Sequence, residues 1–350
     1  MTDLDQRIAS VLRERADGEI DARRLLRGSR ALGRRRQARR RVSAGTALAL
    51  VGVLGFVGAV RGDVGGLAGR MPWAATTPGV TPPPVPPLAD GVPGAATEPA
   101  RVATDPQVLH FAVDPAQARY LGWSARRDDV ESIRFTVGGG RPVLVEVSRS
   151  RDLLSQGGVE GFSFDAGAEP LPFDGSFRQV DGTGGGMILS WRPVAGLYAR
   201  ASTPGTDRDA LRRAVEAVRW DEARRCAGPM RLTTLPPAAT VVSCGVDVSS
   251  FPGGVNVYLS VARGTNATMR VRFDYAGGIA GSRDAGNRTV AGRPAYLSPD
   301  ATELELLGIP KAHLIATFGG FDKGFSEAEA AAVLAGARLA EHPTDPKTWP

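Results

Sequence analysis

The longest apolar stretch of the chain runs from Val42 to Val60 and contains 19 residues without a charge. A helix rises about 1.5 Å per residue, so this length matches a hydrocarbon core about 30 Å thick. The pattern therefore predicts a transmembrane helix over residues 42–60. A cleaved signal peptide is the alternative, because Val57-Gly58-Ala59 fits a cleavage site. A buried core helix is disfavoured by the arginines before the stretch and the prolines after it.

The residues just before this stretch predict its orientation. Positively charged residues near a span stay on the cytoplasmic side, so the N-terminus is predicted inside and residues after about 61 outside. The chain is thus expected to be a single-pass protein of the cell membrane. Gly55 and Ala59 have the spacing that lets two helices approach closely, which allows a homodimer through this helix. The topology-determining residues are Arg34, Arg35, Arg36, Arg39, Arg40 and Arg41.

Residues 1–41 form an Arg-rich tail on the predicted cytoplasmic side. Leu4, Ile8, Val11 and Leu12 recur at helical spacing, which predicts a short amphipathic helix within the tail. Asp21 is expected to cap a second short helix that holds Leu25 and Leu26. A helix this short cannot bury its apolar stripe alone. The stripe is therefore predicted to face a cytoplasmic partner protein or the inner membrane surface.

A proline-rich segment over residues 61–106 follows the predicted span. Ten prolines lie between Met71 and Pro106, with few charges among them. Such a composition favours an extended, semi-rigid chain. The segment is predicted to be a linker that holds the outer part of the chain away from the membrane.

Beyond residue 106, apolar and polar positions alternate over short runs separated by turns such as Gly138-Gly139-Gly140. This alternation is typical of half-buried strands. Two helical patterns interrupt it, one with a weaker cap expected at Thr206 with Asp209 and one opening with a capping box at Ser326 and Glu329. The predicted strands cover residues 133–137, 143–147, 177–180, 187–191 and 197–201, then 241–248, 255–261, 269–275, 295–297, 303–307 and 314–318.

A run of strands followed by a helix occurs twice, which predicts an α+β fold. We expect two tandem modules over residues 107–224 and 225–343, each a mostly antiparallel sheet closed by a C-terminal helix. Residues 344–350 form a C-terminal tail. A weak internal repeat supports the duplication, because residues 115–121 are similar to 237–242 at an offset of 122.

The charge is concentrated at one end of the chain. The formal net charge is +6, yet residues 1–41 alone hold 13 arginines against six acidic residues, and residues 101–350 balance. The chain is therefore a neutral outer part with a basic tail. No helix-turn-helix, zinc-finger or aromatic pattern accompanies the arginines, so no nucleic-acid binding is expected.

Cys226 and Cys244 are the two cysteines, and both fall on the predicted outer side. A disulfide between them is expected in an oxidising compartment, with a free thiol pair as the alternative.

No motif for catalysis or cofactor binding stands out in the sequence. His110, His313 and His342 are isolated, without the spacing of metal ligands. The glycine runs lack the lysine of a phosphate-binding loop, and no nucleophile elbow is present. We therefore expect no enzyme activity, no cofactor and no metal, although a site built from distant residues would escape this reading.

The layout of Arg34-Arg35-Arg36-Gln37-Ala38-Arg39-Arg40-Arg41, one anchor and a Pro-rich spacer resembles single-pass membrane proteins of high-GC actinobacteria, including anti-sigma-factor-like regulators. This resemblance implies a cytoplasmic regulator, such as a sigma factor, as a partner of the tail. The order of Val-x-Gly, apolar strands and a Ser- or Thr-capped helix resembles exported Mog1/PsbP-like α+β modules, which implies binding rather than catalysis.

These patterns predict a membrane protein whose duplicated outer domain binds or senses an envelope component or a partner protein. Its tail would then regulate a cytoplasmic partner. The alternative is a structural envelope protein whose tail serves only as a topology signal. An exported enzyme is the less favoured third interpretation.

Overall fold

A computed structural model describes residues 83–155, 170–180, 185–278, 285–320 and 322–350. The chain divides into two units, residues 1–77 and 78–350, and every described residue belongs to the second. The predicted transmembrane helix, the tail stripe and the arginine cluster lie outside the described residues. Within the described part, no helix is long and apolar enough to cross a membrane.

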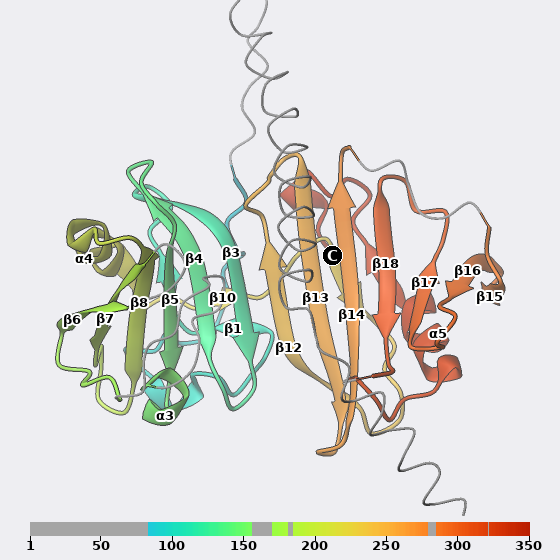
Figure 1. Ribbon diagram of the computed structural model, residues 1–350, viewed down its shortest axis with the longest axis horizontal. Helices are drawn as coiled ribbons and strands as arrows, with labels where there is room; N and C mark the ends of the chain where they lie inside the picture. The colour runs from blue at the N-terminus through green and yellow to red at the C-terminus, as the bar shows by residue number, and fades with distance from the viewer. Residues whose placement is uncertain (1–82, 156–169, 181–184, 279–284, 321) are drawn as a thin grey trace, which may run out of the picture. The chain divides into compact units, whose positions relative to one another are not determined.

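One antiparallel sheet of 13 strands dominates the described unit (Figure 1). Its strands form where apolar and polar residues alternate, since alternation buries one face of each strand. In spatial order the strands are β15 (Arg288–Val290), β16 (Arg293–Leu297), β17 (Glu303–Leu306), β18 (Ala312–Thr317), β14 (Ala267–Ala276), β13 (Gly254–Arg263), β12 (Thr240–Asp247), β3 (Ala118–Arg126), β4 (Glu131–Val137), β5 (Val143–Ser148), β8 (Tyr198–Pro204), β7 (Gly186–Trp191) and β6 (Ser176–Val180).

The two halves of the sheet have the same order of connections. From the centre outward, the first half runs β3-β4-β5-β8-β7-β6 and the second runs β12-β13-β14-β18-β17-β16, with β15 added at the far edge. In the first half β8 leads into helix α4 (Arg208–Glu216), and in the second half β18 leads into helix α5 (Glu327–Ala335). A short strand follows each helix, and each pairs with a short strand that precedes its half. These pairs are β2 (Ala112–Val113) with β9 (Val218–Arg219), and β11 (Met230–Leu232) with β19 (Ala337–Leu339).

The halves meet where β3 pairs antiparallel with β12 (Figure 1). In the middle of this pairing Ser124 lies opposite Gly245. Both strands carry a β-bulge on the side away from the junction, at Leu121 against β4 and at Val242 against β13. A bulge increases the local twist and redirects the side chains that follow it. The junction is therefore formed by two strands with the same irregularity, 121 residues apart.

The main core lies on one face of this sheet and extends across both halves. Val145 and Ile133 of the first half belong to the same buried cluster as Val257 and Phe273 of the second. Helices α4 and α5 contribute Leu211 and Val333 to this cluster, so both helices cover the same face. We call this the core face and the opposite one the outer face.

The outer face of the first half is partly covered by a segment between β5 and β6. This segment contains the short helix α3 (Arg151–Ser155), and Leu154, Leu171 and Phe173 pack there on Leu144 and Ile188. Beneath this cover Arg200 makes a buried ion pair with Glu146, at 2.8 Å. The ion pair is completed by a hydrogen bond from Arg200 to the Leu154 carbonyl, so the buried charge is well compensated.

Residues 83–106, assigned to the linker from composition, lie within the folded unit. Ala95 and Val102 are fully buried in the main core, and Leu88 bridges to Arg224 of β10 (Arg224–Arg225). A 3₁₀ turn, η1 (Pro99–Arg101), precedes β1 (Val108–Leu109), which pairs with β10. The folded unit therefore begins before residue 107, where the first module was expected to start. Proline-rich composition does not distinguish a solvated spacer from an extended segment that packs on a domain.

The expected disulfide is present between Cys226 and Cys244. Cys244 lies on the core face of β12, and the Cys226 amide donates a hydrogen bond to the Gln107 carbonyl. The disulfide ties the segment that connects the two halves to β12, the strand at their junction.

Near its C-terminus the chain forms the 3₁₀ turn η2 (Pro346–Thr348), and the Trp349 ring that follows it packs beside Trp123.

The fold class is confirmed in its broad form, since the unit is a strand-rich α+β structure. The capping box at Ser326 is also confirmed, with the Glu329 amide donating to the Ser326 hydroxyl. The expected cap at Thr206 is wrong by one residue. Asp207 is the N-cap of α4, because its carboxylate accepts from the Ala210 amide.

Candidate functional site

Small polar side chains cross the outer face at the junction of the two halves. One row of paired residues runs from Ser132 through Ser124 and Gly245 to Tyr258 and Arg272, on five neighbouring strands. A second, parallel row runs through Arg126, Ser243, Ser260 and Arg270. In the second row the two central side chains are small and the two end ones are long, so the sheet surface is hollowed between the arginines.

Tyr258 divides this surface into two hollows that share it as a wall. Its ring lies over Gly245, where a Cβ would collide with the ring atoms. Glycine at this position is therefore required by the close approach of the ring rather than by the backbone conformation. The pairing of Tyr258 with Gly245 therefore lets the tyrosine ring lie over β12.

The small hollow, of about 110 Å³, lies on one side of Tyr258, above Gly122. Arg134 and Asp247 are both register partners of Gly122, and their side chains meet across it at 2.6 Å. Burial alone would raise the pKa of Asp247, but hydrogen bonds from Ser249 and the nearby Arg134 guanidinium outweigh it, so the pKa is lowered. The remaining lining residues include Ser124 and Ser132, whose hydroxyls are 2.8 Å apart.

The large hollow, of about 540 Å³, lies on the other side of Tyr258. Most of its lining residues are polar, and they include three arginines against one acidic residue. The lining residues are Arg126, Val242, Ser243, Tyr258, Ser260, Thr268, Arg270, Arg272 and Asp322. The surplus of positive charge is notable because residues 101–350 as a whole are balanced.

Nearby carboxylates orient the three guanidinium groups. Arg126 Nη1 donates to Asp129 at 2.7 Å, and Arg272 Nε lies 2.7 Å from Asp274. Arg270 Nε lies 3.8 Å from Asp322. Each contact of Arg270 and Arg272 uses the Nε edge, and within the described part of the chain their Nη groups donate no hydrogen bond.

The outer face continues past the large hollow onto β18 and β17. Burial raises the pKa of Asp274, and the charges of Arg272 and His313 offset this only in part. His313 Nδ1 lies 2.6 Å from a Glu305 carboxylate oxygen. The carboxylates of Asp274 on β14 and Glu305 on β17 therefore lie next to the arginines but outside the lining of the hollow.

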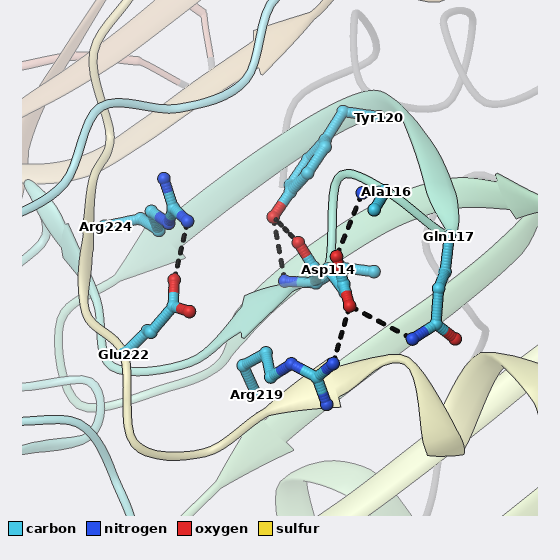
Figure 2. A network of polar contacts seen from close by, with 8 residues as sticks. Asp114, Ala116, Gln117, Tyr120, Arg219, Glu222 and Arg224 are labelled. Carbon is cyan, nitrogen blue, oxygen red and sulfur yellow. Dashed lines mark hydrogen bonds and ion pairs between the residues drawn. The ribbon is translucent and has the colours of Figure 1, made fainter.

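A polar network on the core side of β3 holds the junction strand in place (Figure 2). The Tyr120 hydroxyl donates to the Val113 carbonyl at 2.7 Å and accepts from the Val113 amide at 2.8 Å. Burial raises the pKa of Tyr120 to about 12. Beside it, hydrogen bonds from the Ala116 amide and then from Arg219 lower the pKa of Asp114. These contacts tie β2 and β9 to β3 and are structural.

The residues that the sequence singled out lie elsewhere. Cys226 and Cys244 form the disulfide, on the core side of the sheet. Leu4, Ile8, Val11, Leu12 and the six arginines of residues 34–41 lie outside the described part. His110 is buried, with Nδ1 2.7 Å from a Glu131 carboxylate oxygen, and lies in neither hollow. Across the described ranges, no group of three or more His, Cys, Asp or Glu side chains is placed to hold a metal ion.

Sequence reasoning missed the residues that line the hollows. The available signal was the alternation in β14, where Arg270, Arg272 and Asp274 occupy every second position between apolar residues. Such a pattern predicts a polar face but not which other strands lie beside it. Ser124 and Arg126 were missed altogether, because no strand was predicted over residues 118–126.

Comparisons with known proteins give one structural match. No protein-family model matches the chain. No curated protein matches it either. A solved structure, described as the crystal structure of MucB in complex with MucA(peri), is 12% identical over 64% of this chain and 94% of that chain, with a TM-score of 0.22. At that TM-score the likeness carries no argument about fold or function.

Proposed function

We propose that this chain is a single-pass membrane protein whose outer unit binds an envelope component or a partner protein through the outer face of its large sheet. In this proposal residues 42–60 span the membrane and the unit of residues 78–350 lies outside the cell. The binding surface is the pair of hollows beside Tyr258. The tail of residues 1–41 regulates a cytoplasmic partner, such as a sigma factor, when the outer face is occupied.

The observation that carries the proposal is the open, polar line across the sheet junction. Among the described residues no segment covers this part of the sheet face, and most side chains on it are polar, which suits a recognition surface. Here it holds two hollows with hydroxyl, aromatic and guanidinium groups converging on them. A few converging polar groups in a concave site are the usual mark of ligand recognition. The equivalent face of the first half is covered by α3 and Phe173, so the opening is confined to the junction and the second half.

We infer that the two halves are copies of one module. The shared connection order and the bulges at Leu121 and Val242 support this inference. In such a pair Ser124 and Gly245 would be equivalent residues that face each other. Two copies joined in this way place the hollows at the centre of the sheet, where both modules contribute side chains.

Photo-crosslinking on the full chain in its native cells tests the binding face. A crosslinking amino acid at Ser260, inside the large hollow, is expected to form a discrete adduct. The matched control is the same amino acid at Arg213, an exposed position of α4. Adducts of equal yield at both positions, or at neither, would contradict a binding surface at the junction.

The same experiment tests the tail. A crosslinker at Leu12, on the predicted apolar stripe, is expected to capture a cytoplasmic protein, whereas one at Gln6, on the opposite side of the helix, is not. Crosslinks from Leu12 to lipid alone would favour the alternative, in which the chain is a structural envelope protein and the tail only sets its topology.

A further inference from the structure

The large hollow has an excess of hydrogen-bond donors and of positive charge. Three guanidinium groups and three hydroxyls line it, from Ser243, Ser260 and Thr268, while Asp322 is its single acidic residue. The formal charge of the lining is therefore +2. This surplus belongs to the lining alone, because Asp129 and Asp274, which pair with Arg126 and Arg272, lie outside it.

The ion pairs of Arg270 and Arg272 leave the Nη edges of both guanidinium groups available. The contacts of Arg270 with Asp322 and of Arg272 with Asp274 are made through Nε. The Nη pairs remain for a ligand, and both arginine side chains are about half exposed, at 56% and 51%. A guanidinium edge with two N–H groups fits the oxygens of an oxyanion.

The register sets the distance between the basic groups. Arg126, Ser243, Ser260 and Arg270 are paired in one row across four adjacent strands. Strands lie about 4.8 Å apart, so the backbones of the two arginines are about 14 Å from each other. A small group above the two serine hydroxyls therefore lies within reach of Arg270 and of its neighbour Arg272, with Arg126 at the opposite wall.

We propose that the large hollow binds a phosphate group, with Arg270 and Arg272 as its principal donors. This inference rests on the proposed function and names the chemistry of its ligand. A phosphate monoester carries a charge of about −2 and three acceptor oxygens, which match the charge and the donor number of the hollow. A carboxylate offers two oxygens and one charge, so it would leave a guanidinium group and several hydroxyls unused.

Calorimetric titration of the full chain in neutral detergent tests the proposal, with inorganic phosphate and glycerol 3-phosphate as probes. In R270Q/R272Q the affinity for both is expected to fall about tenfold or more. The control is R212Q/R213Q on α4, which removes the same charge from an exposed surface. The Arg-rich tail is unchanged in all three proteins, so its own attraction for anions cancels from the comparison.

The source of the phosphate is tested with vesicles. Reconstituted chain is titrated with a soluble phosphate ester in vesicles of phosphatidylcholine alone and in vesicles that also contain phosphatidylglycerol. If a lipid headgroup is the ligand, phosphatidylglycerol will compete with the soluble ester in the wild type but not in R270Q/R272Q. If the ligand is a soluble or polymeric phosphate, the two kinds of vesicle will give the same ester affinity.

Equal phosphate affinity in the wild type and R270Q/R272Q overturns the proposal, as does an equal loss in the α4 control. Unfolding midpoints of the variants, measured in parallel, show whether a loss reflects misfolding. A Ser260 crosslink without phosphate binding would leave the binding face standing and reject its phosphate chemistry. Failure of both experiments would reject the binding face as well.

Discussion

Gly245 shows how one residue without a side chain shapes the candidate site. Its register partner Tyr258 lies where a Cβ would have to be, and the ring separates the two hollows. At Gly122 a Cβ would instead collide with the Val246 carbonyl oxygen of the neighbouring strand, while Arg134 Nη2 lies at ordinary contact distance. Gly245 therefore lets a large side chain lie low on the sheet surface, whereas Gly122 permits the close approach of a backbone.

Gly245→Ala is expected to destabilise the unit by about 1–2 kcal/mol, because the added methyl group must displace the ring. In a Tyr258→Ala background the same change should be neutral or stabilising, since alanine suits a strand better than glycine. Urea unfolding of residues 78–350 for the four proteins of this cycle measures the coupling. Additive costs for the two changes would mean that the ring does not rest on Gly245.

At the scale of elements, local patterns predicted most strands of the sheet well. The alternation over residues 255–261 and 269–275 corresponds to β13 and β14, and the capping box at Ser326 begins α5. These signals are local, so they can be read from a single sequence.

Besides the edge strand β15, the strand of the large sheet that escaped prediction is β3, at the centre of the sheet. Its bulge at Leu121 shifts the alternation, so Tyr120 and Trp123 both face the core although they are three residues apart. The bulge interrupts the alternation of buried and exposed residues in the strand that joins the two halves. The consequence for the site is large, because Ser124 and Arg126 lie on this strand.

Substitutions at the start of α5 and just before α4 should differ in their effect on stability. Ser326→Ala should cost about 1 kcal/mol of unfolding free energy, because it removes the acceptor of the Glu329 amide in the capping box. Thr206→Ala should change it by less than about 0.5 kcal/mol, because Asp207 caps α4 instead. Urea unfolding of residues 78–350 measures both, and a larger cost at Thr206 would contradict the caps described here.

At the scale of the whole molecule, the pairing of β3 with β12 decides what the unit can do. This pairing joins residues more than a hundred positions apart, and no local pattern in the sequence specifies it. It merges the cores of both halves and brings Arg126 beside Ser243 and Ser260. The sequence could therefore predict an α+β unit with a disulfide, but not where its polar faces would meet.

In the whole molecule the open outer face is proposed to lie on the outer side of the membrane. If both proposals are correct, the large hollow is accessible from the cell exterior. Ser260 lies within that hollow, Ser202 is fully buried under the cover of the first half, and Ser10 lies in the Arg-rich tail.

Labelling of single cysteines in the full chain with a membrane-impermeant maleimide tests this most directly. In intact cells we expect Ser260→Cys to react, Ser202→Cys to react only after unfolding, and Ser10→Cys only after the membrane is permeabilised. Because Cys226 and Cys244 are joined in a disulfide, they give no background. A Ser260→Cys that is labelled only in permeabilised cells, or a Ser10→Cys that is labelled in intact ones, would contradict the account.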